Sequence, residues 1–139
     1  MAEITSLSQQ LTDILISHIP DLWAVYLFGS ICTDRFNADS DIDIAFIGAQ
    51  SVDSIKRWDI QEIIAAQLHK DIDLVDMRSA TTIMQKQIIE TGQRVYCGAQ
   101  FLSRVEHFES KCIWLYIDLM ELNAPLYARI TKDLSLIHI

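Results

Sequence analysis

Apolar residues recur along this chain at two spacings, one typical of helices and one typical of strands. Helical spacing predicts helices over residues 6–18, 52–70 and 79–92, with Asp53 or Ser51 near the start of the second and Ser79 capping the third. Short apolar or alternating runs predict strands over residues 22–28, 40–48, 71–77 and 93–97. This order of elements predicts a small mixed α/β (α+β) fold, in which helices flank one mixed β-sheet.

The chain from residue 101 onward is predicted to be helical, with Pro125 breaking or kinking the helix. A first apolar row, which we expect to pack on the domain's own sheet, consists of Val105, Phe108, Cys112, Leu115, Leu119 and Leu122. A second row, the better candidate for a contact with another protein, consists of Ile113, Tyr116, Met120 and Tyr127. We therefore expect one domain over residues 1–100 and a C-terminal helical extension over residues 101–139, packed on that domain.

Composition narrows the class of protein. Half of the 139 residues are hydrophobic and only two are proline, which excludes a disordered or low-complexity chain. The three cysteines are widely spaced and lack zinc-binding spacing, so we expect buried thiols in a reducing compartment. The chain shows no signal-peptide pattern and no apolar run long enough to span a bilayer. We therefore expect a cytoplasmic protein without a membrane partner.

The formal net charge of −8 is unevenly distributed. Residues 1–43 carry seven acidic side chains against Arg35 alone. Such a surface would repel a nucleic-acid backbone, so we expect no direct nucleic-acid partner. Metal ions and a basic protein surface are better candidates.

One arrangement of residues carries chemistry: Gly29-Ser30, ten intervening residues, and then Asp41-Ile42-Asp43. Side chains two apart on a strand point to the same face, so Asp41 and Asp43 emerge together, opposite the apolar face of the strand. Two such carboxylates repel each other unless a cation lies between them, and oxygen ligands favour Mg²⁺. The Gly-Ser turn offers backbone N–H groups and a hydroxyl to phosphates. The bland alternative is a turn at Ser40-Asp41 followed by an exposed Asp43.

A third carboxylate is expected from the strand over residues 71–77. If this strand lies beside the preceding one, Asp73 approaches the Asp41 and Asp43 pair, and three carboxylates then suit two-metal nucleotidyl transfer. The third could also accept the proton of an attacking hydroxyl. Asp71 shares the face with Asp73 and is its rival for this role.

These residues resemble the minimal nucleotidyltransferase (MNT) family of the DNA polymerase β-type superfamily. The segments LFGS, SDIDIAF, IDLVDM and TGQRVYCG carry the resemblance, which covers about residues 11–98. It implies the polymerase β-type fold and ATP as nucleotide donor. It also implies Asp41, Asp43 and Asp73 as catalytic metal ligands, and nucleotide contacts at Gly29, Ser30, Arg35 and Ser40. Family members usually carry a basic residue and a glycine in the loop after Gly-Ser, whereas this loop has Arg35 as its only cation.

The resemblance also implies a biological role. Stand-alone MNT proteins are typically paired with a HEPN-domain ribonuclease toxin, so the chain is expected to be an antitoxin that transfers AMP from ATP to a tyrosine of that toxin, in a hetero-oligomer. Two alternatives remain open. The chain could be an antitoxin that only occludes its toxin, or a nucleotidyltransferase for small molecules of the aminoglycoside type.

Overall fold

The structure is a computed structural model that describes the backbone of residues 2–137 and the side chains of residues 5–122. The strands are β1 (Leu22–Phe28), β2 (Ile42–Gly48), β3 (Ile72–Asp76) and β4 (Gln93–Cys97). The α-helices are α1 (Ala2–His18), α2 (Ser54–Leu68), α3 (Thr82–Thr91) and α4 (Leu102–Ile137). Two short 3-10 helices, η1 (Gly29–Cys32) and η2 (Ala99–Phe101), follow β1 and β4.

The four strands form one mixed sheet in the order β3-β2-β1-β4. Strand β1 runs antiparallel to β2 and to β4, whereas β2 and β3 are parallel and are joined by α2. The parallel pair aligns Asp43 directly with Asp73. This sheet confirms the expected mixed α/β fold and the expected adjacency of the second and third strands.

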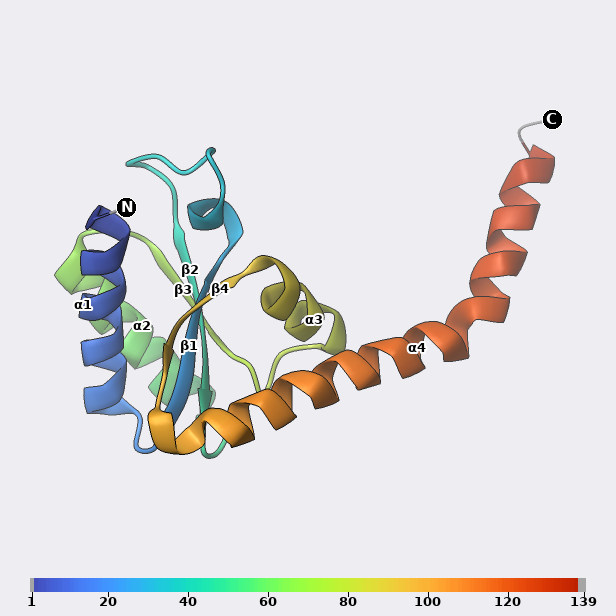
Figure 1. Cartoon of the computed structure of the whole chain (residues 1–139). Helices are drawn as coiled ribbons and strands as arrows, with labels where there is room; N and C mark the ends of the chain where they lie inside the picture. Colours follow the sequence, from blue (N-terminus) through green and yellow to red (C-terminus); the bar gives the residue numbers. More distant parts are fainter. Residues whose placement is uncertain (1, 138–139) are drawn as a thin grey trace.

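Helices cover both faces of the sheet, with α1 and α2 on one side and α3 with the start of α4 on the other (Figure 1). Alternation along the strands divides the core between these layers. Ile42, Ile44 and Phe46 of β2 are fully buried on the α1/α2 side. Ala45 and Ile47 are buried on the other side, which is the face that also carries Asp43.

The helix caps and ends agree only in part with those predicted from the sequence. Asp53 caps α2, with its carboxylate accepting a hydrogen bond from the Ile55 N–H at 3.2 Å, as one of the two expected caps. The expected cap at Ser79 is wrong, because the Thr81 hydroxyl accepts from the Met84 N–H at 3.2 Å and α3 starts at Thr82. Helix α3 ends before Gly92, as expected.

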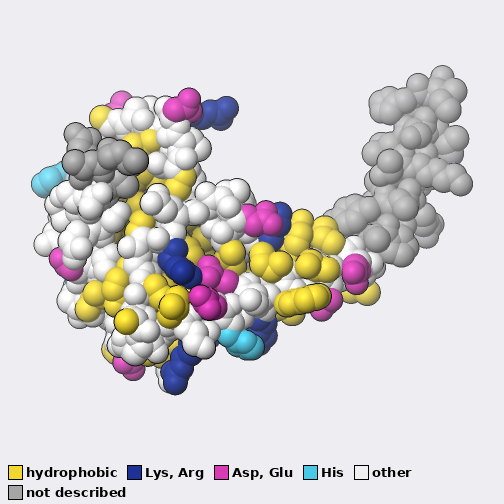
Figure 2. Space-filling model, viewed as in Figure 1, with side chains coloured by type: hydrophobic (Ala, Val, Ile, Leu, Met, Phe, Trp, Pro, Cys, Tyr) yellow, Lys and Arg dark blue, Asp and Glu magenta, His cyan; other side chains and the backbone are white. Residues whose placement is uncertain are grey.

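Helix α4 packs on the sheet only through its first turns. Val105 and Cys112 are buried, but Leu115 and Leu122 of the same apolar row are 46% and 80% exposed. Figure 2 shows hydrophobic side chains gathered along this outer stretch of α4. The helix continues past Pro125 to Ile137, so the break does not occur, whereas Figure 1 shows α4 changing direction in its outer part, as a kink requires. Tyr127, from the second row, lies outside the described side chains.

A polar contact fixes the inner part of α4. The buried Tyr26 hydroxyl donates to Glu109 Oε2 at 3.1 Å, and Arg94 Nη1 forms a salt bridge with Glu109 Oε1 at 2.8 Å. Burial and then the nearby Glu109 carboxylate raise the pKa of Tyr26. These contacts join β1, β4 and α4, so the helix leaves the sheet in a defined direction.

Within the part of the chain that the structure describes, no helix is both long enough and apolar enough to cross a membrane.

Candidate active site

The turn after β1 brings the backbone against a carboxylate. Gly29 has φ +75°, a conformation that L side chains rarely adopt, and it begins η1. A Cβ atom built on Gly29 would overlap Asp43 Oδ2. Only glycine fits at this position without strain or a shift of the carboxylate, so the Gly-Ser turn and β2 form one local structure.

The three expected carboxylates converge at one end of the β2–β3 pair. Asp41 immediately precedes β2 and is exposed, while Asp43 is half-buried as the second residue of β2. Asp73 is the exposed second residue of β3, opposite Asp43 in the register. The structure therefore brings Asp41 and Asp73 beside Asp43, which itself lies against the turn at Gly29.

The environment of Asp43 disfavours its negative charge. Its burial, and then the neighbouring carboxylates of Asp73 and Asp41, raise the pKa of Asp43 above its usual value. Each of these causes disfavours the negative charge on Asp43. A cation bound between the carboxylates would remove the repulsion.

The structure separates Asp73 from its neighbours on β3. Asp71 precedes the strand, and its backbone carbonyl accepts from the Ile42 N–H at 2.9 Å. The Asp71 side chain is not among the groups that raise the pKa of Asp43, whereas Asp73 is. The Asp76 side chain is 3% exposed and accepts from the Val52 and Arg78 N–H groups at 2.7 and 3.0 Å. Asp73 is therefore the carboxylate of β3 that lies beside Asp43, and Asp76 anchors the segments that begin at Val52 and Arg78.

Residues 33–41 form the loop that joins η1 to β2, and Asp41 is its last residue. The Ser30 carbonyl accepts from the Thr33 hydroxyl at 2.8 Å, and the Ser40 hydroxyl accepts from the Asn37 N–H at 3.0 Å. The Arg35 side chain is exposed, and its guanidinium forms no hydrogen bond or salt bridge with any residue that the structure describes. Ser30 and Arg35 thus keep side chains free for a ligand, whereas the Ser40 oxygen already helps to shape the loop.

Lys70 is a neighbour of this loop that sequence reasoning missed. Its ammonium donates to the Ala38 carbonyl at 3.0 Å and lies 5.5 Å from the centre of the Phe36 ring. It ties the loop to the end of α2 and adds a second cation beside Arg35. Its position just before β3 and the aspartates of that strand is a signal for a role near the site. Its partner Ala38, however, lies 32 residues away in the sequence, so the contact itself cannot be predicted from spacing.

The donor set fits Mg²⁺. Among the described side chains, no group of three His, Cys, Asp or Glu is arranged to hold a metal by itself. Mg²⁺ seldom uses such an all-protein cage and is usually held by one or two carboxylates together with substrate phosphates. The clustered carboxylates of Asp41, Asp43 and Asp73 offer oxygen ligands of this kind, and the repulsion that raises the pKa of Asp43 would be relieved by a bound cation.

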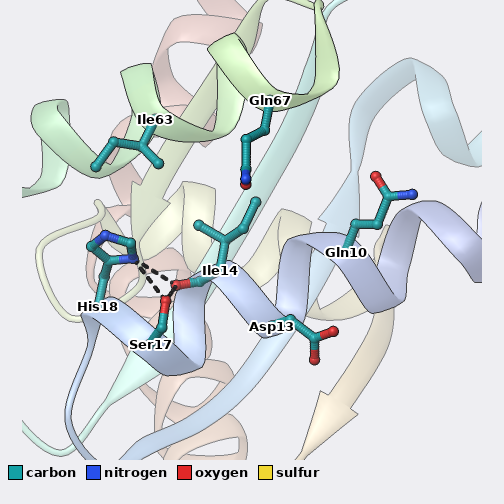
Figure 3. Close-up of a pocket in the computed structure, with 7 residues that line it drawn as sticks. All are labelled: Gln10, Asp13, Ile14, Ser17, His18, Ile63 and Gln67. Carbon is teal, nitrogen blue, oxygen red and sulfur yellow. Dashed lines mark hydrogen bonds between the residues drawn. The ribbon is translucent and has the colours of Figure 1, made fainter.

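A cavity of about 490 Å³ between α1 and α2 offers less chemistry (Figure 3). Ser17 Oγ and His18 Nδ1 lie 3.0 Å apart, which resembles a nucleophile and its base. Both atoms also contact the Ile14 carbonyl, at 2.7 and 2.9 Å, and a carbonyl can only accept. The Ser17 hydroxyl thus donates to the Ile14 carbonyl, and a His18 Nδ1 that donates to the same carbonyl is not available as a base for Ser17.

Comparison with known proteins identifies the class of this fold and site. Residues 9–101 match the family described as polymerase beta, nucleotidyltransferase, and the chain belongs to this family. The resemblance seen in the sequence is thereby confirmed.

Three relatives are informative. The protein adenylyltransferase MntA of Shewanella oneidensis is 39% identical over 103 residues, which cover 74% of this chain and 72% of MntA. A chain in the crystal structure of a toxin–antitoxin with AMP-PNP has a TM-score of 0.79 at 32% identity, covering 89% of this chain and 98% of that chain. A chain in the complex of the tri-AMPylated Shewanella oneidensis HEPN toxin with MNT antitoxin has a TM-score of 0.76 at 30% identity. That match covers 94% of this chain and 99% of the other.

Proposed function

We propose that this protein is the enzymatic antitoxin of a toxin–antitoxin pair, and that it transfers AMP from ATP to a tyrosine of a HEPN ribonuclease toxin. The observation that carries the proposal is the register of Asp43 with Asp73 beside the Gly29 turn. Family membership and the adenylyltransferase and toxin–antitoxin relatives support it.

Each site residue has a role in this proposal. The tyrosine oxygen of the toxin attacks the α-phosphorus of ATP, the bond from that phosphorus to the bridging oxygen breaks, and pyrophosphate leaves. Asp73 accepts the phenolic proton. The Gly29 turn, the Ser30 hydroxyl and the guanidinium of Arg35 hold the phosphates, and Ser40 shapes the loop beside them.

Asp41, Asp43 and Asp73 would hold Mg²⁺. When bound, Mg²⁺ neutralises the phosphates and orients the attacking and leaving oxygens. The mutual repulsion at Asp43 supports this part of the proposal, because a cation relieves it.

The proposed partner is a protein, and the active complex is a hetero-oligomer. The net charge of −8 suits a basic ribonuclease and disfavours direct nucleic-acid binding. We place the pair in the cytoplasm, where ATP is available and the three free cysteines stay reduced. We also propose that residues 1–100 are the nucleotidyltransferase domain and residues 101–139 an extension of it.

A second candidate is an antitoxin that acts by occlusion alone. The exposed apolar residues on the outer stretch of α4, including Trp114 at 66% exposure, favour a protein contact there. Such a contact would also be compatible with the enzyme. The small-molecule alternative has no comparable support, because the relatives reported above are an adenylyltransferase of proteins and chains from toxin–antitoxin structures.

Protection of cells that express the toxin separates the two candidates. The double substitution Asp41→Asn plus Asp43→Asn leaves the α4 surface unchanged, so an occluding antitoxin would still protect the cells. The enzyme proposal predicts that protection is lost although the variant still binds the toxin. Full protection by the double variant would refute transfer as the mode of neutralisation.

A further inference from the structure

A second cavity lies at the end of the sheet opposite the aspartates. It has a volume of about 430 Å³, and its wall includes Trp23 near the start of β1, Arg78 after β3, and the first turns of α4. Figure 1 shows the start of α4 at the other end of the sheet from the loop that joins β1 to β2. We call it the basic cavity, because Arg78, Arg104 and Lys111 line it.

The charge of Arg78 is held in a fixed position. Its Nε donates to the Gly48 carbonyl at 2.7 Å, and its guanidinium carbon lies 4.7 Å from the centre of the Trp23 ring and 5.3 Å from that of Phe108. The guanidinium of Arg104 lies 5.8 Å from the same Trp23 ring. Two cations therefore share one aromatic wall, with the terminal nitrogens of Arg78 left available.

This positive charge has no internal counterpart. The residues that line the basic cavity include no Asp or Glu, and none of its three cations forms a salt bridge with a described residue. The chain as a whole has 19 acidic and 11 basic residues, so acidic partners are not scarce. Three like charges around one cavity repel each other, and an external anion would relieve this repulsion.

The cavity wall also carries a hydroxyl donor. Ser103 contributes it from the first turn of α4, where the helix dipole favours negative charge. A neutral ligand would leave the charges of Arg78, Arg104 and Lys111 unmatched.

We propose that the basic cavity binds a small phosphate-type oxyanion. Arginine side chains suit the oxygens of a phosphate group, lysine adds a point charge, and the volume is that of a small-ligand site. The anion could be free pyrophosphate or the phosphate chain of a nucleotide. The cavity is separate from the carboxylates, so this binding does not depend on the proposed AMP transfer.

Tryptophan fluorescence of the full chain tests the proposal. Trp58 and Trp114 are 55% and 66% exposed, so Trp58→Phe plus Trp114→Phe leaves Trp23 as the one indole without disturbing the core. Sodium pyrophosphate, inorganic phosphate and ATP are titrated in turn, without divalent metal and at constant ionic strength. We expect a saturable change in Trp23 emission with pyrophosphate. Equal binding of ATP would point to the phosphate chain as the ligand, and tighter binding of ATP to a nucleotide.

Matched variants locate the binding. Arg104→Gln and Lys111→Gln should each weaken pyrophosphate binding about tenfold, since a charged hydrogen bond is worth roughly one such factor. Lys56→Gln, which removes an exposed lysine outside the cavity, should have no effect. Asp41→Asn plus Asp43→Asn should bind as before. Absence of saturation, binding by the cavity variants equal to that of the natural protein, or loss of binding in the aspartate variant would each overturn the proposal.

Discussion

Gly29 and Asp43 occupy adjoining space, and this contact sets the geometry of the candidate site at the scale of single residues. The glycine has φ +75°, and a methyl group there would overlap the Asp43 carboxylate. Gly29→Ala should therefore lower AMP transfer at least about tenfold, because left-handed strain costs about 1–2 kcal/mol and the carboxylate must also shift. Gly48→Ala, at the end of β2 far from Asp43, is the control. Equal transfer by Gly29→Ala and the natural protein would contradict this role for the turn.

Asp43 is predicted to lower the stability of the metal-free protein while it supports AMP transfer. Burial and the charges of Asp73 and Asp41 disfavour its ionised form, so Asp43→Asn should raise the melting temperature of the metal-free protein. The same substitution should reduce AMP transfer by about a hundredfold or more. Differential scanning fluorimetry and a transfer assay measure the two effects.

Asp71→Asn is the matched control, because Asp71 immediately precedes β3, two residues before Asp73, and only Asp73 of the two pairs with Asp43 in the register. It should keep most of the activity. Loss of activity in Asp71→Asn with activity retained in Asp73→Asn would show that the rival residue fills the role.

The sequence predicts these residues well because the information is local. Alternation puts Asp41 and Asp43 on one face, and a parallel neighbour brings Asp73 opposite Asp43. Lys70 could not be predicted in the same way, since its bond to the Ala38 carbonyl exists only when α2 and the loop have folded together.

At the scale of elements, Lys70 is predicted to position the loop over residues 33–41. Lys70→Met keeps most of the unbranched side chain but removes the hydrogen bond to Ala38 and the charge over Phe36. The KM for ATP should rise about threefold to tenfold, with little change in kcat, because the loop loses its anchor rather than its chemistry. Lys56→Met is the control.

Limited proteolysis gives a readout of the same variant that is independent of activity. Arg35 lies in the exposed loop, so trypsin should cleave after it faster in Lys70→Met than in the natural protein. An unchanged KM together with an unchanged cleavage rate would exclude this positioning role.

The sequence predicts the positions of helices and strands more reliably than it predicts which side of a helix is buried. All four strands occur where alternation or apolar runs place them. The helical spacing over residues 52–70 rests on Ile55, Trp58, Ile63, Ile64 and Leu68, but the buried residues of α2 are Ile60 and Ile64, while Ile55 is 71% exposed. Apolar character marks a helix and does not fix which apolar residue meets the core, because that depends on the sheet beneath it. The same reason explains why the apolar row of α4 is buried near Val105 and exposed at Leu122.

At the scale of the whole molecule, the sequence reports charge but not its arrangement. The acidic excess over residues 1–43 is visible in the chain, whereas the basic cavity draws on residues from β1, the segment after β3, and α4. Only the fold brings Arg78 and Arg104 to one tryptophan ring. The molecule thus combines a carboxylate site at one end of the sheet with a positive cavity at the other.

Label transfer from ATP tests the central claim most directly. The purified protein is incubated with the proposed HEPN toxin, Mg²⁺, and ATP labelled at either the α- or the γ-phosphate. Transfer of AMP predicts that the α-label remains on a tyrosine of the partner, that the γ-label does not, and that Asp41→Asn plus Asp43→Asn abolishes labelling. Labelling from the γ-phosphate, or no α-label on the partner with intact protein and metal present, would contradict the account.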